Sequence, residues 1–164
     1  MLFRSITGNS GANYENVATT GTVLTSVTDD TDTTTVTLSS AAPGSVVEGS
    51  TITYTATVGQ AVTGTPLVLT LSNSETITIA VGQTTGSVVH TVRADDAYLQ
   101  GTQNLSVSIT GNSGANYENV ATTGTVLTSV TDDADTTTVT LSSAAPASVV
   151  EGSTITYTAT VGQA

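Results

Sequence analysis

Two short acidic segments carry the side chains of this chain that are best suited to bind a cation. Each follows a run of Thr and Val, and together they supply Asp29, Asp30, Asp32, Asp132, Asp133 and Asp135. Carboxylates held about 4–6 Å apart repel one another by roughly 1 kcal/mol or more when they are only partly solvated. A divalent cation relieves that repulsion, and Ca²⁺ accepts oxygen ligands in a loose geometry. The two segments are therefore predicted to be metal sites.

The two acidic segments are copies of each other within a long internal repeat. Residues 5–61 and 108–164 form the same block, and its copies differ only at Thr31/Ala134 and Gly44/Ala147. The period of 103 residues is the size of a whole domain rather than of one solenoid turn. We therefore expect the last strands of one repeat in residues 1–32, a complete repeat in 33–135 and the first strands of another in 136–164.

Alternating apolar and polar residues predict β-strands throughout the complete repeat. Residues 51–58 are the clearest case, with Thr on one face and four apolar side chains on the other: Ile52, Tyr54, Ala56 and Val58. Residues 41–50 are predicted to be a loop, and the last strand, 120–130, is expected to bend near Gly124. Seven such strands in about 100 residues predict an antiparallel β-sandwich of immunoglobulin-like type.

Successive strands of such a sandwich run up and down, so alternate loops meet at the same end. Seven of the eight acids of the complete repeat then fall at the end where the next repeat begins, among them Glu48, Asp95 and Asp96. Because the chain has no Cys, an all-oxygen site favours Ca²⁺ over Zn²⁺ or copper. The alternative is that these acids are solvated charges in polar loops. Arg93 is expected to pair with nearby acids at the surface, where ion pairs add little stability.

Charge and composition disfavour several classes of partner. With 13 acids and 2 bases the formal net charge is −11, which opposes binding to nucleic acid and to anionic membrane surfaces. No apolar run approaches the ~18 residues of a membrane span, so membrane insertion is not expected. No nucleophile elbow or acid–base pair stands out, so we predict that the protein is not an enzyme. His90 is expected to be a structural histidine on a core face.

Several segments resemble calcium-binding modules of known families. Val47-Glu48-Gly49-Ser50, Ala94-Asp95-Asp96-Ala97-Tyr98 and Val130-Thr131-Asp132-Asp133 are similar to segments of Calx-β-like modules. The whole repeat, above all residues 51–58, 108–111 and 116–119, resembles more closely the extender repeats of large RTX-type bacterial biofilm adhesins. That resemblance implies an extracellular, cell-surface protein exported by type I secretion, whose repeats hold an adhesive tip away from the cell. It also implies that Ca²⁺ stiffens the junctions between repeats, with ligands at Glu48, Asp95, Asp96, Asp132, Asp133 and Asp135.

One departure from the Calx-β pattern bears on the number of ions. Those modules often carry further acids after the Asp-Asp pair, where this chain has Ala97-Tyr98-Leu99-Gln100. We therefore expect a single calcium ion at each junction, with the neighbouring repeats of the same chain as partners. Two other functions stay open: a module that binds a glycan or surface through loops such as 111–119, which the scarcity of aromatic residues disfavours, and a Calx-β-type calcium sensor.

The incomplete repeats at the two ends are expected to be unstable by themselves. Residues 1–32 and 136–164 each supply little more than two strands, so apolar faces and strand edges stay uncovered. We expect these ends to fray, or to pair with the ends of another chain.

Overall fold

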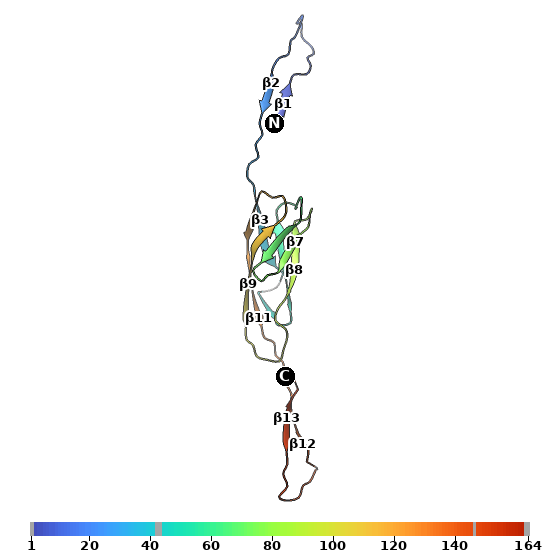
Figure 1. Ribbon diagram of the computed structural model, residues 1–164, viewed down its shortest axis with the longest axis vertical. Helices are drawn as coiled ribbons and strands as arrows, with labels where there is room; N and C mark the ends of the chain where they lie inside the picture. Colours follow the sequence, from blue (N-terminus) through green and yellow to red (C-terminus); the bar gives the residue numbers. More distant parts are fainter. Residues whose placement is uncertain (1, 42–43, 146, 163–164) are drawn as a thin grey trace. The chain divides into compact units, whose positions relative to one another are not determined.

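The computed structural model describes residues 2–41, 44–145 and 147–162. These residues form strands, turns and irregular segments, and among them there is no helix that could cross a membrane. The chain divides into two compact units, residues 1–32 and residues 33–164, whose strands are drawn in Figure 1. The prediction of an all-β protein is confirmed.

The first unit is built on a two-stranded hairpin. β1 (Leu2–Ser5) and β2 (Thr22–Thr25) are antiparallel, with Leu2 paired with Thr25 and Ser5 paired with Thr22. Every residue of both strands is exposed, including the apolar side chains of Phe3 and Leu24. This hairpin therefore buries no apolar core of its own.

The second unit begins with two sheets that pack as a sandwich, as the alternating pattern predicts. The four-stranded sheet has the order β10-β3-β5-β8, and the five-stranded sheet has the order β4-β11-β9-β6-β7. Their strands are β3 (Thr33–Ser40), β4 (Ser45–Val47), β5 (Thr51–Val58), β6 (Leu67–Leu71), β7 (Thr76–Ile79), β8 (Thr85–Thr91), β9 (Gln103–Ser113), β10 (Asn119–Thr123) and β11 (Thr125–Thr131). Only the β10–β3 and β11–β4 pairs among them are parallel.

The core consists of inward-facing side chains from both sheets. Along β5 every second residue is buried, and the threonines between them are exposed or half-buried. The buried apolar residues include Val36, Leu38, Ile52, Tyr54, Ala56, Val58, Leu67, Leu69, Leu71, Ile77, Ile79, Val107 and Val130. Burying a large side chain of this kind stabilises a fold by about 1.5–3 kcal/mol, so this cluster holds the sandwich together.

The structure has nine strand segments between residues 33 and 131 outside the undescribed residues 42–43, because one of the seven predicted strands is divided and one further strand lies in a predicted loop. The prediction of a loop over 41–50 is wrong in part, because β4 lies there and pairs with β11. The predicted strand 120–130 is broken at Gly124, whose φ is +95°. A Cβ at Gly124 would lie 2.5 Å from the carbonyl oxygen of Leu38, so only glycine fits where the chain passes from one sheet to the other.

A second hairpin follows the sandwich and repeats part of its pairing. β12 (Val139–Ser143) and β13 (Tyr157–Val161) pair Val139 with Val161, as β3 and β5 pair Val36 with Val58 one repeat earlier. Val36 and Val58 are 0% and 3% exposed, whereas Val139 and Val161 are 63% and 56% exposed. The sequences are the same, so the difference in burial comes from the second sheet that covers β3 and β5.

Candidate metal centre

Three segments meet at one end of the sandwich: the turn after β4, the loop after β8 and the segment after β11. Because β4 and β11 are parallel, with Val47 paired with Thr131, the residues that follow them leave the sheet together. The Glu48 N–H donates to the Thr131 carbonyl (3.0 Å), and the Gly49 N–H donates to the Arg93 carbonyl (2.9 Å). These backbone hydrogen bonds join all three segments at the turn that carries Glu48.

Gly49 allows the turn and the loop after β8 to approach each other closely. Its φ is +72°, a left-handed conformation that side chains with a Cβ rarely adopt. A Cβ at Gly49 would also lie 3.1 Å from the Cβ of Asp95. The glycine therefore places the Asp95 backbone directly beside the turn that holds Glu48.

Glu48, Asp95 and Asp133 come together as a cluster of three acids, one from each segment. One carboxylate oxygen from each lies within 4.8 Å of the others, and this is the sole such group of three or more potential ligands in the described part of the chain. Asp95 and Asp133 are exposed, while Glu48 is buried. The arrangement offers a cation access from solvent on one side and a buried carboxylate on the other.

The Glu48 carboxylate is buried and only half satisfied. Its side chain is 1% exposed, and its Oε2 accepts a hydrogen bond from Arg93 Nε at 2.8 Å. Its Oε1 is buried without a hydrogen-bond partner. Burial raises the pKa of Glu48 above its ordinary value, the bond from Arg93 opposes that rise, and the neighbouring Asp132 adds to it. A cation or a proton bound to such a buried, unpartnered carboxylate oxygen would stabilise the folded state.

Asp132 has its carboxylate engaged within the protein. Its Oδ1 accepts from Arg93 Nη2 at 3.2 Å, and its Oδ2 accepts from the Gln100 N–H at 3.1 Å. Asp132 therefore ties the segment after β11 to the loop after β8. It stands next to the three-acid cluster and is not one of its three members.

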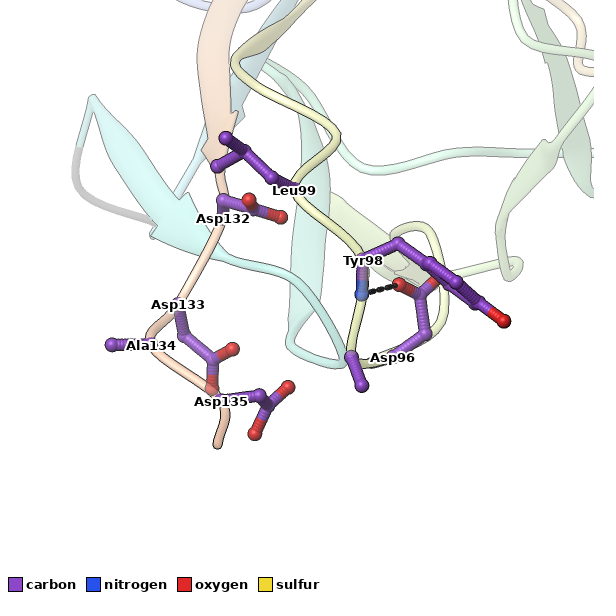
Figure 2. Close-up of a pocket in the computed structure, with 8 residues that line it drawn as sticks. Asp96, Tyr98, Leu99, Asp132, Asp133, Ala134 and Asp135 are labelled. Carbon is purple, nitrogen blue, oxygen red and sulfur yellow. Dashed lines mark hydrogen bonds between the residues drawn. The ribbon is translucent and has the colours of Figure 1, made fainter. Parts of the chain in front are cut away.

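An open cavity of about 140 Å³ lies between the loop after β8 and the segment after β11, and Asp133 is the member of the three-acid cluster that lines it. Figure 2 shows the carboxylates of Asp133 and Asp135 on the side of their segment that faces the loop carrying Asp96. Asp96 is held by its own loop, because it accepts hydrogen bonds from the Tyr98 N–H (2.8 Å) and from the Gln100 side chain. The negative charge of Asp133 raises the pKa of Asp135, with smaller contributions from burial and from the charge of Asp95.

The other acidic segment is placed differently. Asp29, Asp30 and Asp32 belong to the first unit, are all exposed, and are not members of the three-acid cluster. They thus stay predicted ligands, whereas Glu48, Asp95 and Asp133 are a group that the fold itself assembles.

Of the two basic side chains in the sandwich, Arg93 differs from the prediction and His90 agrees with it. Arg93 was predicted to form exposed ion pairs, but its side chain is only 16% exposed and contacts a buried partner. His90 is half-buried, with its Nδ1 3.3 Å from Glu75 Oε1 and its ring centroid 6.2 Å from that of Tyr54. No local signal reveals the role of Arg93, because its acidic partners Glu48 and Asp132 lie 45 and 39 positions away in the sequence.

The comparison with known families agrees with the repeat pattern. The family model of the LapA domain matches residues 32–133, which is nearly the whole of the complete repeat. No curated protein and no solved structure matches the chain. Because the matched residues make up more than half of the chain, it belongs to the LapA domain family and is a biofilm-adhesin-related protein.

Proposed function

We propose that this chain is a structural spacer of a calcium-dependent adhesin at the bacterial cell surface, with no catalytic activity. The observation that carries the proposal is the buried, unpartnered Oε1 of Glu48 beside Asp95 and Asp133. An adhesin family and a tandem repeat of whole domains support the spacer role. Export by type I secretion stays a prediction.

Calcium is the ion that best suits this set of ligands. The cluster offers carboxylate oxygens only, and hard divalent cations prefer oxygen ligands. The open cavity beside Asp133 leaves room for water ligands, of which Ca²⁺ uses several. Extracellular calcium modules often bind with dissociation constants of about 10⁻⁴–10⁻³ M, which suits a site outside the cell.

The position of Asp133 connects the ion to the junction between repeats. Asp133 lies two residues before Asp135, after which the next copy of the repeat begins at Thr136. An ion held by Glu48 and Asp95 on the sandwich and by Asp133 on the connecting segment would fix the direction in which the chain leaves the sandwich. Calcium would then stiffen the string of repeats, and its removal would loosen it.

A thermal melt of the full chain tests the metal site. At a free concentration of about 100 times its dissociation constant, a ligand of the native state adds about 2.7 kcal/mol, which raises the Tm of a domain this size by roughly 10 °C or more. We expect that rise with Ca²⁺ and not with Na⁺ at matched ionic strength. Asp133→Asn should abolish it, whereas Asp30→Asn, the same position one repeat earlier, should not. Equal responses of both variants would support solvated charge instead.

A distance measurement tests the spacer role separately. The chain has no cysteine, so Ser87→Cys and Ser142→Cys, on exposed residues of β8 and β12, create a unique pair for spin labels. We expect Ca²⁺ to narrow the distance distribution between the two labels and expect no narrowing in Asp133→Asn. If Ca²⁺ binds but the distance distribution does not narrow, the metal site would stand and the proposed stiffening of the spacer would be wrong.

A further inference from the structure

Arg93 contacts all three segments that build the acidic cluster. The chain contains only two basic side chains besides His90, namely Arg4 and Arg93, and no Lys. Arg93 Nε donates to Glu48 Oε2 (2.8 Å), Nη1 donates to the Gly101 carbonyl (2.8 Å) and Nη2 donates to Asp132 Oδ1 (3.2 Å). The guanidinium group thus binds the turn after β4, the loop after β8 and the segment after β11 at once.

Arg93 contacts only one of the two carboxylate oxygens of Glu48. Arg93 occupies Oε2 and leaves Oε1 buried and free of hydrogen bonds. A planar, rigid guanidinium group fixes the orientation of a carboxylate better than a flexible ammonium group does. The side chain that would offer Oε1 to an ion is therefore held in place before any ion arrives.

The same guanidinium group anchors the connecting segment one residue before a cluster ligand. Asp132 accepts from Arg93 and from the Gln100 N–H, so both of its oxygens are held by the loop after β8. Asp133, the next residue, is exposed and faces the cavity. The segment after β11 consequently has one acid bound by the protein's own cation and the next acid available to an exchangeable one.

We propose that Arg93 is the positioning residue of the cation site. It also anchors the connecting segment to the sandwich in a way that does not depend on metal. Arg93 holds Glu48 and Asp132 in place when no ion is bound, and the ion adds the anchor at Asp133. This inference rests on the proposed calcium site. Without the ion, the connecting segment is expected to loosen after Asp132 and to stay attached up to that residue.

The change in calcium affinity on removal of the Arg93 side chain distinguishes ligand positioning from a simple effect of charge. A positive charge beside the site opposes a second cation, so by Coulomb's law alone its removal should tighten calcium binding. If Arg93 instead positions the ligands, its removal weakens binding, because the ion must then order Glu48 and two loops itself. The two explanations predict changes of opposite sign.

Calorimetric titration of the full chain with Ca²⁺ measures that sign. We expect the dissociation constant to rise at least tenfold in Arg93→Gln and also in Arg93→Lys, which keeps the charge and loses the fork-shaped donor set. Arg4→Gln, on the exposed strand β1, is the control and should bind as the wild type does. Unchanged or tighter binding by Arg93→Gln would overturn the role of Arg93 alone. A wild-type chain that binds no calcium would overturn the proposed function, and this inference with it.

A measurement on the unaltered protein covers the case in which the Arg93 variants do not fold. The Gln100 N–H donates to Asp132 Oδ2, so its hydrogen exchange reports whether Asp132 is held. In excess chelator we expect Gln100 to exchange at least tenfold more slowly than an unprotected amide. Protection that appears only when Ca²⁺ is added would show that the ion, and not Arg93, anchors Asp132.

Discussion

At the scale of single residues, Glu48 combines burial with an incomplete set of hydrogen bonds, and this combination makes its protonation sensitive to metal. Its pKa is raised, chiefly by burial, above the ordinary value of 4.5. The native state then binds more protons than the unfolded state between pH 4.5 and the raised value. The free energy of unfolding therefore falls as the pH rises through that window.

Because the free energy of unfolding is expected to fall with rising pH, the stability of the protein should depend on pH differently with and without calcium. In chelator, we expect the wild type to be more stable toward denaturant near pH 5 than near pH 7, and Glu48→Gln to lose part of that difference. With saturating Ca²⁺ the trend should reverse, because protons compete with the ion for the same carboxylates. Urea unfolding at both pH values measures both effects. A wild type and a Glu48→Gln variant with the same pH dependence in chelator would contradict the prediction.

Two tyrosines differ in whether the side-chain hydroxyl has a hydrogen-bond partner. The Tyr54 hydroxyl is buried without a hydrogen-bond partner, and burial, with the charge of Glu75, raises the pKa of Tyr54. Tyr117 instead donates to the Gln60 carbonyl at 2.6 Å. We expect Tyr54→Phe to raise the free energy of unfolding by about 1 kcal/mol and Tyr117→Phe to lower it by about 1 kcal/mol. Destabilisation by both variants would mean that the Tyr54 hydroxyl has a partner such as a buried water.

At the scale of elements, the break between β10 and β11 decides how the sandwich closes. β10 extends the four-stranded sheet beside β3, and β11 joins the five-stranded sheet between β9 and β4. Gly124 permits this change of sheet, and the β11–β4 pairing then brings Glu48 to the segment that follows β11. The cation site therefore depends on a glycine at the opposite end of β11.

The requirement for glycine at this break predicts an unequal effect of two similar substitutions. Gly124 and Gly82 both have a positive φ, but a Cβ at Gly82 would meet nothing within 4 Å, whereas at Gly124 it would meet the Leu38 carbonyl. Gly82→Ala should cost about 1–2 kcal/mol for the left-handed backbone alone. Gly124→Ala should cost clearly more, and denaturant unfolding compares the two. Equal losses of unfolding free energy in the two variants would show that the backbone near Leu38 can shift to accommodate the added methyl group without destabilising the fold.

At the scale of the whole molecule, one sequence occurs in two environments. The β3–β5 pairing in the sandwich and the β12–β13 pairing in the hairpin share residues and register. The sandwich adds a second sheet over the first pair, whereas every residue of β12 and β13 is exposed. Local stability follows burial, so the two pairs should open with very different free energies.

Amide hydrogen exchange on the full chain measures this difference. We expect the β12–β13 amides, and those of β1–β2, to exchange orders of magnitude faster than their counterparts in the sandwich. The residues of β2, β12 and β13 are the same as those of their counterparts, so for these strands differences in intrinsic exchange rate largely cancel. Equal protection would mean that the hairpins are covered, for example by the matching strands of another chain, which is the pairing between chains that we predict as the alternative to fraying.

Sequence patterns alone predict most of the strands, the repeat, and the end of the sandwich at which the acids are expected to gather. Alternation predicted residues 51–58 as a strand with the bounds that β5 has, because a period of two reports which face of a strand is buried. Acids in loops that alternate along the chain were predicted to meet at one end of a sandwich, because successive strands reverse direction. The repeat and its motifs led to biofilm adhesins, and the LapA domain match supports that family.

Which acids form a cluster, and which of them are buried or hydrogen-bonded, depends on contacts between distant parts of the chain. The parallel pairing of β4 with β11 lies within a predicted loop and joins residues more than 80 positions apart, so no local pattern reveals it. That pairing buries Glu48, and the Arg93 guanidinium then occupies one oxygen of Glu48 and one of Asp132. Sequence shows which residue types are near one another in the chain, but burial and hydrogen bonding depend on distant segments that meet only after folding.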